Sequence, residues 1–152
     1  MALRPRLLLT ITLLGWLSAV SSVFAVETST VSYPSGTDTV SSFLAKPDGP
    51  GPFPAVIVIH EWWGLNDQIK ETAKKFAAEG YLALAVDLYR GRATANREEA
   101  HELMRGLPED RAVRDLQAAV AYLASRKDVR AKRIGSIGWC MGGGYSLSLA
   151  VN

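Results

Sequence analysis

The stretch IGSIGWCMGGGYSLSLA, residues 134–150, decides how this chain folds. An apolar run typical of a strand leads to Gly138, and a run typical of a helix follows the glycines. Between the two runs, residues 138–142 match the pattern Gly-x-nucleophile-x-Gly of a strand-to-helix elbow. Cys140, the only cysteine of the chain, holds the nucleophile position. The stretch therefore predicts an α/β fold that presents a thiol at a sharp turn.

The two glycines that flank Cys140 have a steric reason to be there. The nucleophile of such an elbow adopts a positive φ, and side chains two residues to either side would collide. Gly138 and Gly142 carry no Cβ. The turn also sets the thiol at a helix N-terminus, where the dipole stabilises a thiolate. The alternative is a buried filler cysteine, but the strand, turn and helix around it favour a reactive thiol.

Two other glycine motifs do not fit this stretch. A Walker A loop requires Lys and then Ser or Thr after its last glycine, whereas Gly144 and Tyr145 follow Gly143. A dinucleotide fingerprint requires the spacing G-x-G-x-x-G, which is not found here. These motifs therefore give no sign of a nucleotide site. We predict no cofactor and no metal site.

The first 25 residues have the pattern of a secretory signal peptide. Arg4 and Arg6 precede an apolar stretch at 7–17, and Val-Phe-Ala at 23–25 forms a small-residue cleavage site. The apolar stretch is shorter than the roughly 20 residues that span a bilayer, and no cysteine near the cleavage site offers a lipid anchor. We expect cleavage after Ala25, export to the periplasm or the medium, and one partial domain at 26–152.

The charge balance argues against a nucleic-acid partner. Arg4 and Arg6 account for the whole net charge of +2, so the rest of the chain is neutral and offers no predicted basic stripe. The rest of the chain is long enough for one hydrophobic core. A single cysteine cannot form an internal disulfide. No oligomeric state is predicted.

Apolar runs and turn residues predict the strands. Residues 31–46 read as two short strands around a turn at 34–36. The runs AVIVIH (55–60) and YLALAVDLY (81–89) are apolar throughout, which is typical of strands buried on both faces. RIGSIG (133–138) is the next strand.

Helical periodicity predicts the segments between these strands. Asn66 can cap a helix that Gly80 ends. A second helix has one apolar face, and Pro108 starts a third with a core stripe. The apolar face of the second helix comprises Ala100, Leu103, Met104 and Leu107. The core stripe of the third comprises Val113, Leu116, Val120 and Leu123. This alternation predicts a parallel sheet covered by helices on both faces.

Polar and reactive residues follow three of the strands. His60 and Glu61, residues 87–92, and Trp139 with Cys140 all lie at predicted strand ends. In open α/β sheets, ligands gather at the carboxyl ends of the strands. We therefore expect the functional site at this edge.

Three pieces of the sequence, from about Val40 onward, resemble the dienelactone hydrolase family of α/β-hydrolases. They are IHEWWGLN (59–66), AVDLYRGR (85–92) and GWCMGG (138–143), in this order. The resemblance implies an α/β-hydrolase-type, mostly parallel sheet that is incomplete at the C-terminus. It also implies a hydrolase of the carboxymethylenebutenolidase type, which acts on a small-molecule ester or lactone.

The resemblance also implies roles for individual residues. Cys140 would attack the carbonyl, and Glu61 would help to deprotonate the thiol. The backbone N–H groups of Trp62 and Met141 would form the oxyanion hole. Such donors stabilise the negative charge that develops on the carbonyl oxygen. Glu61 can equally be an ordinary loop acid. Trp62 and Trp63 either line a pocket or pack in the core.

The segment after the second buried strand matches the family less closely. The family places an arginine just after Asp-Leu-Tyr to hold a substrate carboxylate, a task that suits the bidentate guanidinium. Here Arg90 and Arg92 flank Gly91, and each can instead be a solvated surface charge. We expect Asp87 to brace the strand end and His101 to lie on the surface.

The catalytic acid and histidine of such a hydrolase are expected after the nucleophile. Residues 141–152 contain neither, and His60 precedes the elbow, where the family does not place its base. Three more βα units would complete the sheet. We therefore expect an N-terminal part with little or no turnover. The alternative is a catalytically dead binding or interaction module. A serine-type lipase is disfavoured because Cys140 stands where serine would.

Overall fold

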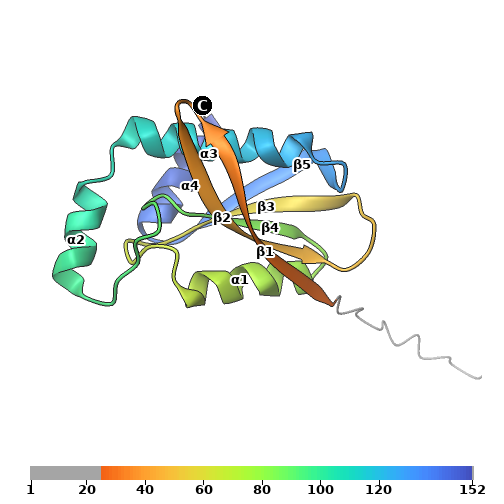
Figure 1. Cartoon of the computed structure of the whole chain (residues 1–152), viewed down its shortest axis with the longest axis horizontal. Helices are drawn as coiled ribbons and strands as arrows, with labels where there is room; N and C mark the ends of the chain where they lie inside the picture. Colours follow the sequence, from red (N-terminus) through yellow and green to blue (C-terminus); the bar gives the residue numbers. More distant parts are fainter. Residues whose placement is uncertain (1–24, 152) are drawn as a thin grey trace, which may run out of the picture.

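The computed structural model of the protein describes residues 25–151, so the signal-peptide prediction falls almost entirely outside the described residues. The described part forms one sheet with helices packed against it (Figure 1). In chain order its elements are β1 (Val26–Ser35), β2 (Asp38–Pro47), β3 (Phe53–Ile59), α1 (Asp67–Ala78), β4 (Leu82–Val86), α2 (Arg97–Arg105), α3 (Glu109–Ser125), β5 (Val129–Gly138) and α4 (Met141–Val151). No helix within residues 25–151 is long and apolar enough to cross a membrane.

The strands form a mixed sheet in the order β1-β2-β4-β3-β5. β3 pairs in parallel with β4 and β5, whereas β2 is antiparallel to both of its neighbours, β1 and β4. The prediction of an α/β fold is confirmed, and the strands β4, β3 and β5 that alternate with helices are parallel as expected, whereas the hairpin makes the sheet mixed. A tight turn at Gly36, which has a φ of 62°, returns the chain beside itself and can only produce an antiparallel pair.

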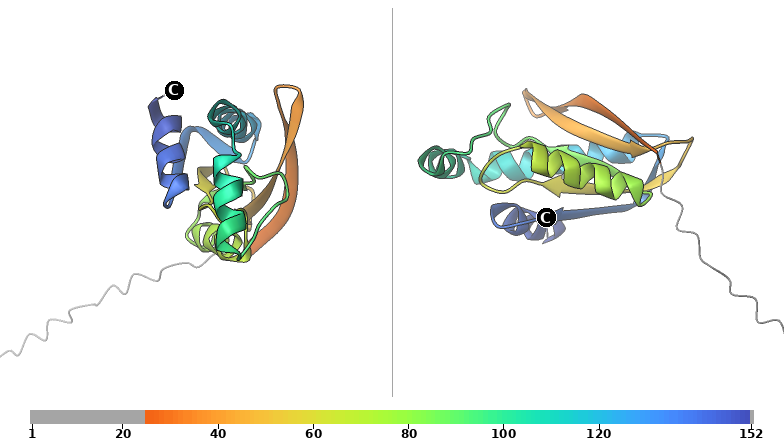
Figure 2. Two further views of the ribbon diagram at one scale, coloured as in Figure 1. Left: turned by 90° about the vertical axis from the view of Figure 1, so that its left-hand side faces the viewer. Right: turned by 90° about the horizontal axis from the view of Figure 1, so that it is seen from below.

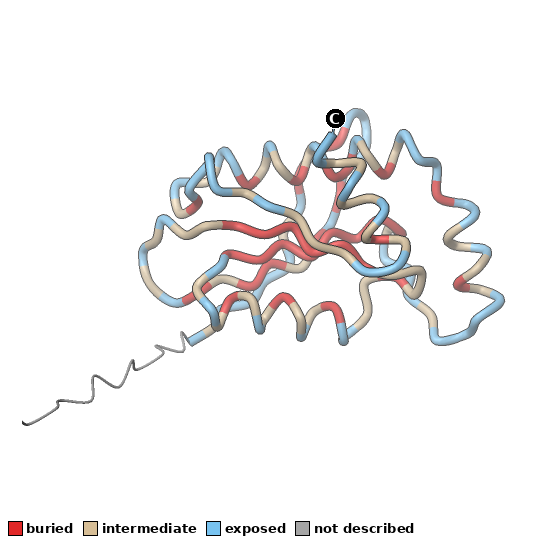
Figure 3. The backbone as a smooth tube through the Cα atoms, turned by 180° about the vertical axis from the view of Figure 1, so that it is seen from behind, coloured by how far each residue is buried: buried red, intermediate tan, exposed pale blue. Residues whose placement is uncertain are grey.

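Helices cover the two faces of the sheet, as the alternation of elements predicts (Figure 2). Val56 and Val58 of β3 face α1, whereas Ile57 and Ile59 belong to the cluster that packs against α3 and α4. Successive side chains of a strand point to opposite faces, so a strand covered on both sides is apolar throughout. The central strands are accordingly the most buried part of the described chain (Figure 3).

The predicted first helix is confirmed at both ends. The Asn66 side chain accepts a hydrogen bond from the N–H of Ile69 at 3.1 Å, and Gly80 follows the helix with a φ of 89°. α2 ends at Arg105, so Leu107 is buried beyond the helix rather than within it.

The predicted core stripe of α3 is partly wrong. Leu116 and Leu123 are buried as expected, but Val113 and Val120 are only half-buried. The buried side also carries two alanines and a carboxylate, namely Ala112, Ala119 and Asp115. The helix is turned toward these small side chains because Asp115 has partners inside the fold.

Asp115 is fully buried and joins three parts of the chain. Its carboxylate accepts a hydrogen bond from the Ser35 hydroxyl at 2.6 Å and pairs with the Arg90 guanidinium at 2.9 Å. Arg90 also donates to the carbonyl of Thr39 at 2.7 Å. The charged pair therefore ties the β1–β2 hairpin and the segment after β4 to α3.

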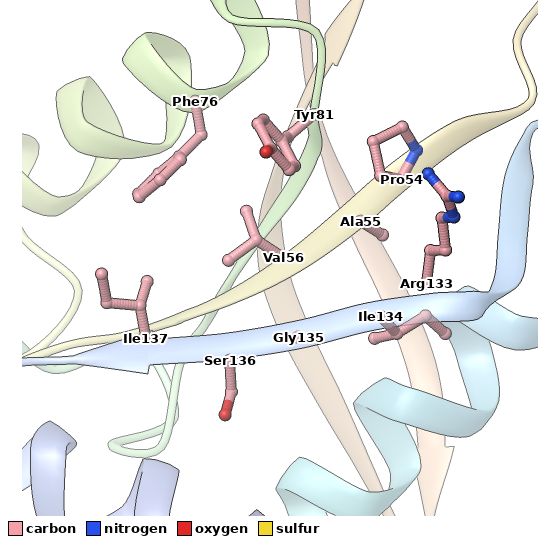
Figure 4. Close-up of a pocket in the computed structure, with 10 residues that line it drawn as sticks. All are labelled: Pro54, Ala55, Val56, Phe76, Tyr81, Arg133, Ile134, Gly135, Ser136 and Ile137. Atoms are coloured by element: carbon pink, nitrogen blue, oxygen red, sulfur yellow. The ribbon is translucent and has the colours of Figure 1, made fainter.

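β5 lies at the edge of the sheet in the described part of the chain, and the α1 face beside it is open. A groove of about 570 Å³ is lined there by β3, β5, Phe76 of α1 and Tyr81 (Figure 4). Phe76 and Tyr81 face Val56 and Ile137 across it (Figure 4). Neither Glu61 nor Cys140 lines this groove, so it is separate from the predicted site.

Candidate active site

The turn between β5 and α4 has the geometry of a nucleophile elbow. Cys140 lies between Gly138, the last residue of β5, and Met141, the first residue of α4. Its φ is 53°, a left-handed conformation that is uncommon for a residue with a side chain. Its side chain is exposed and forms no disulfide. The elbow therefore presents a free thiol to solvent at a helix N-terminus.

Both flanking glycines are required by close backbone approaches. A Cβ on Gly138 would collide with the backbone of Gly142. A Cβ on Gly142 would lie 2.5 Å from the carbonyl oxygen of Ile59 and 2.6 Å from that of His60. Any real Cβ contact at such a distance forces atoms to move, so the elbow rests directly on the end of β3. This contact brings Cys140 to the strand end that Glu61 follows.

Two backbone N–H groups are free at these neighbouring strand ends. β3 and β5 pair in parallel up to Ile59 and Gly138, so the residues that follow them emerge side by side. Among residues 25–151, the N–H groups of Trp62 and Met141 have no acceptor. Free donors that follow two adjacent strands have the arrangement that an oxyanion hole requires. Their role, like those of Cys140 and Glu61, remains a prediction.

His60 is fully buried between the ends of β3 and β4. Its Nε2 accepts a hydrogen bond from the N–H of Leu88 at 3.2 Å, so Nδ1 carries the proton and donates to the carbonyl oxygen of Glu61 at 2.6 Å. Burial lowers the pKa of His60, and the nearby carboxylate of Asp87 opposes this only in part. Both ring nitrogens are thus engaged with the backbone, in accord with the expectation that His60 is not the base.

Tyr89 packs between His60 and the elbow. Its ring lies edge-on to the His60 ring with centroids 4.7 Å apart, and its hydroxyl donates to Sδ of Met141 at 3.4 Å. Burial raises the pKa of Tyr89 to about 12, with smaller contributions from Tyr145 and Cys140. The tyrosine is therefore protonated at neutral pH and serves as a hydrogen-bond donor. Sequence patterns assign no role to Tyr89, although it lies within the motif AVDLYRGR, three residues after the end of β4.

Trp62 and Trp63 are both half-buried and touch each other, with ring centroids 4.9 Å apart. Their loop is held by a hydrogen bond from the N–H of Thr94 to the carbonyl of Trp63 at 3.0 Å. His101 of α2 meets the Trp62 ring edge-on at 5.9 Å and is half-buried. The expectation that His101 is a surface residue is wrong, because α2 packs this face against the tryptophan.

The two arginines after β4 lie in different surroundings. Arg90 forms the buried pair with Asp115, so its guanidinium already has a structural partner. Arg92 is exposed and pairs with Glu99 at 3.1 Å. A substrate-binding role remains a prediction for both. The expectation for Asp87 is confirmed, because its carboxylate accepts from the N–H groups of Tyr89 at 3.0 Å and Gly91 at 2.5 Å.

Within residues 25–151, no three His, Cys, Asp or Glu side chains lie close enough together to hold a metal ion. The groups present at this edge of the sheet are the thiol of Cys140, the carboxylate of Glu61, two residues after β3, and two free backbone donors.

The dienelactone hydrolase family model matches residues 40–152. The chain belongs to the dienelactone hydrolase family. The family resemblance of the three motifs is thereby confirmed, together with the α/β-hydrolase fold class.

Individual relatives agree with this assignment. Protein usf of Aquifex pyrophilus is 38% identical over 117 residues, which cover 73% of this chain and 50% of that protein. A "Putative carboxymethylenebutenolidase" of Aquifex aeolicus is 37% identical over 117 residues, with 73% and 50% covered. The crystal structure of a "Putative Dienelactone Hydrolase" from Klebsiella pneumoniae is 29% identical, with a TM-score of 0.76 over 84% of this chain and 55% of that one. The chain thus spans about half the length of the curated relatives that it matches.

The contact between elbow and β3 in this dienelactone hydrolase family member can be tested with alanine. Gly142→Ala should lower the free energy of unfolding by about 1–3 kcal/mol, because the new methyl group meets two carbonyl oxygens. Gly144→Ala is the matched control: its Cβ would meet nothing within 4 Å, and alanine favours a helix over glycine by up to about 1 kcal/mol. Urea unfolding measures both. Equal stabilities of the two variants would contradict the close approach.

Buried His60 predicts a pH dependence of stability. The unfolded chain takes up a proton as the pH falls through about 6.5, whereas the lowered pKa keeps His60 neutral in the fold. Stability is therefore fully present above pH 6.5 and declines below it, by at most about 1.4 kcal/mol per pH unit. Urea unfolding between pH 5 and 7.5 should show this slope in the wild type and a smaller slope in His60→Gln. Equal slopes in the wild type and in His60→Gln would show that the pKa of His60 is the same in the folded and the unfolded chain.

Proposed function

We propose that the protein is a thiol-dependent hydrolase of small-molecule esters or lactones, with Cys140 as its nucleophile. The observation that carries this proposal is the elbow itself, with an exposed thiol beside the free N–H groups of Trp62 and Met141. The family assignment supports the same chemistry, since relatives are named for a carboxymethylenebutenolidase.

In the proposed first step, the Cys140 thiol loses its proton to the Glu61 carboxylate and the sulfur attacks the carbonyl carbon. A carbon–sulfur bond forms, and the carbonyl electrons move to oxygen, where the two N–H donors stabilise the negative charge. The carbonyl double bond then re-forms as the carbon–oxygen bond to the leaving group breaks, and the leaving oxygen takes the proton that Glu61 received from the thiol. The products are a thioester on Cys140 and an alcohol or a ring-opened hydroxyl group.

The proposed second step is hydrolysis of this thioester, which requires a base that activates water. The 152 residues contain two histidines, His60 and His101. His60 is buried with both nitrogens bonded to the backbone. Within residues 25–151, the contact recorded for His101 is with the Trp62 ring, and no carboxylate is recorded as its partner. We therefore expect this chain to be acylated once and to deacylate slowly.

A single-turnover acylation tests the proposal. Mixed with excess 4-nitrophenyl acetate, the chain should release about one equivalent of nitrophenolate and gain one acetyl group at Cys140, as measured by absorbance and intact-protein mass spectrometry. Cys140→Ala should do neither, since no nucleophile remains. Glu61→Gln should slow the step, by about 10²-fold if Glu61 takes the proton.

A release of nitrophenolate that survives in Cys140→Ala would refute the nucleophile assignment. Absence of acylation in a folded wild type would instead favour a binding module that keeps the fold without the chemistry.

We also propose that the chain is exported, on the basis of the charged, apolar and small-residue pattern of its first 25 residues. Expressed in a bacterium, the chain should appear in the periplasm with Val26 as its first residue, which N-terminal sequencing detects. Arg4→Glu combined with Arg6→Glu should retain more of it in the cytoplasm. A chain that keeps Met1 and remains cytoplasmic would contradict the proposal.

A further inference from the structure

The carbonyl of Glu61 and the N–H of Trp62 belong to a single peptide group. Such a group is planar and trans, so its oxygen and its hydrogen point in opposite directions. The Glu61 oxygen is held by Nδ1 of His60 at 2.6 Å and by the N–H of Gly64 at 3.2 Å. With the oxygen fixed toward His60, the Trp62 N–H is fixed in the direction that leads away from it.

His60 is in turn held by the segment that follows β4. Its Nε2 accepts from the N–H of Leu88 at 3.2 Å, and its ring lies against Tyr89. Leu88 itself is held from the other side, because its carbonyl accepts from the Arg111 guanidinium at 3.2 Å. The imidazole therefore has a fixed position rather than a choice of rotamers.

Tyr89 extends this contact to the second donor. Its hydroxyl binds Sδ of Met141 at 3.4 Å, and Met141 carries the other free N–H group. Tyr89 is 5% exposed, so its ring cannot leave this position without opening the core. His60 thus contacts the peptide group that carries the Trp62 N–H, and Tyr89 contacts Met141, although neither side chain is itself a donor to the substrate.

We propose that His60 and Tyr89 are positioning residues that hold the Trp62 and Met141 N–H groups in place for the oxyanion. The inference rests on the proposed function, because it assigns the geometry of the same site. His60 is suited to this task in its neutral form, which offers one donor and one acceptor at fixed positions. Buried polar groups that are fully hydrogen-bonded rigidify their surroundings.

Two reactions of Cys140 distinguish a change in the position of the N–H donors from a general disturbance of the elbow. Acylation by 4-nitrophenyl acetate develops an oxyanion, whereas alkylation by iodoacetamide displaces iodide at a saturated carbon and develops none. A change in the position of the donors should therefore lower the rate of acylation and leave that of alkylation unchanged. A disturbed elbow should alter both rates. The ratio of the two rate constants is the measurement.

We expect this ratio to fall about 10- to 100-fold in His60→Leu, somewhat less than the loss of a whole oxyanion donor. His60→Gln keeps one donor and one acceptor, so its ratio should stay closer to that of the wild type. Tyr89→Phe, which loses only the hydroxyl, should lower the ratio about fivefold. Lys132→Gln, an exposed substitution on β5, is the control and should change neither rate.

The outcomes separate this inference from the proposed function. A wild type that is alkylated but never acylated overturns both. A wild type that is acylated, together with a folded His60→Leu that has an unchanged ratio, overturns the positioning role alone. Where circular dichroism shows that His60→Leu is unfolded, Tyr89→Phe decides: a lowered ratio supports the inference, and an unchanged ratio in the folded variant overturns it.

Discussion

The backbone of the elbow lies against the carboxyl end of β3 with no room for a side chain between them. This contact depends on two features at once: the absence of a Cβ on Gly142 and the left-handed backbone of Cys140. Because β5 pairs with β3 in parallel up to Gly138, the chain must turn away from the sheet immediately after the last paired residue. The same turn starts α4. The position of the thiol is therefore set by strand pairing and backbone sterics, before any side chain takes part.

One of the two residues that the elbow touches, His60, is polar, although it lies where the surrounding residues of the fold are apolar. His60 ends a run of buried aliphatic residues in β3 and is itself fully buried. An unpaired imidazole would be unfavourable there, since burying a polar group without partners costs about 1–3 kcal/mol. Hydrogen bonds to Glu61 and Leu88 satisfy both nitrogens. The buried histidine thus joins the segment after β3 to the segment after β4, which strand pairing alone leaves unconnected.

Much of this arrangement could be predicted from the sequence, because it follows from short-range patterns. The apolar runs of β3 and β4, the Asn66 cap and the glycines around Cys140 are signals that local geometry imposes. Features that depend on long-range partners could not be predicted in the same way. Asp115 is buried because Arg90 and Ser35 meet it from 25 and 80 residues away, and no periodicity of α3 reveals such partners. The same pair turns α3 toward its alanines and leaves Val113 and Val120 half-buried.

The candidate site shows the same division between local and distant determinants. The segments after β3 and β5 carry the free N–H groups of Trp62 and Met141, and both segments can be recognised in the sequence because their residues form motifs. The segment after β4 carries neither of the proposed oxyanion donors, yet Leu88 and Tyr89 contact His60, and Tyr89 binds Met141. Donors on two separate segments can act on one oxygen atom only if their relative position is fixed, and pairing between β3 and β5 ends before either donor is reached. The position of the donors must then be fixed by side chains beyond the sheet, and the contacts of His60 and Tyr89 meet that requirement.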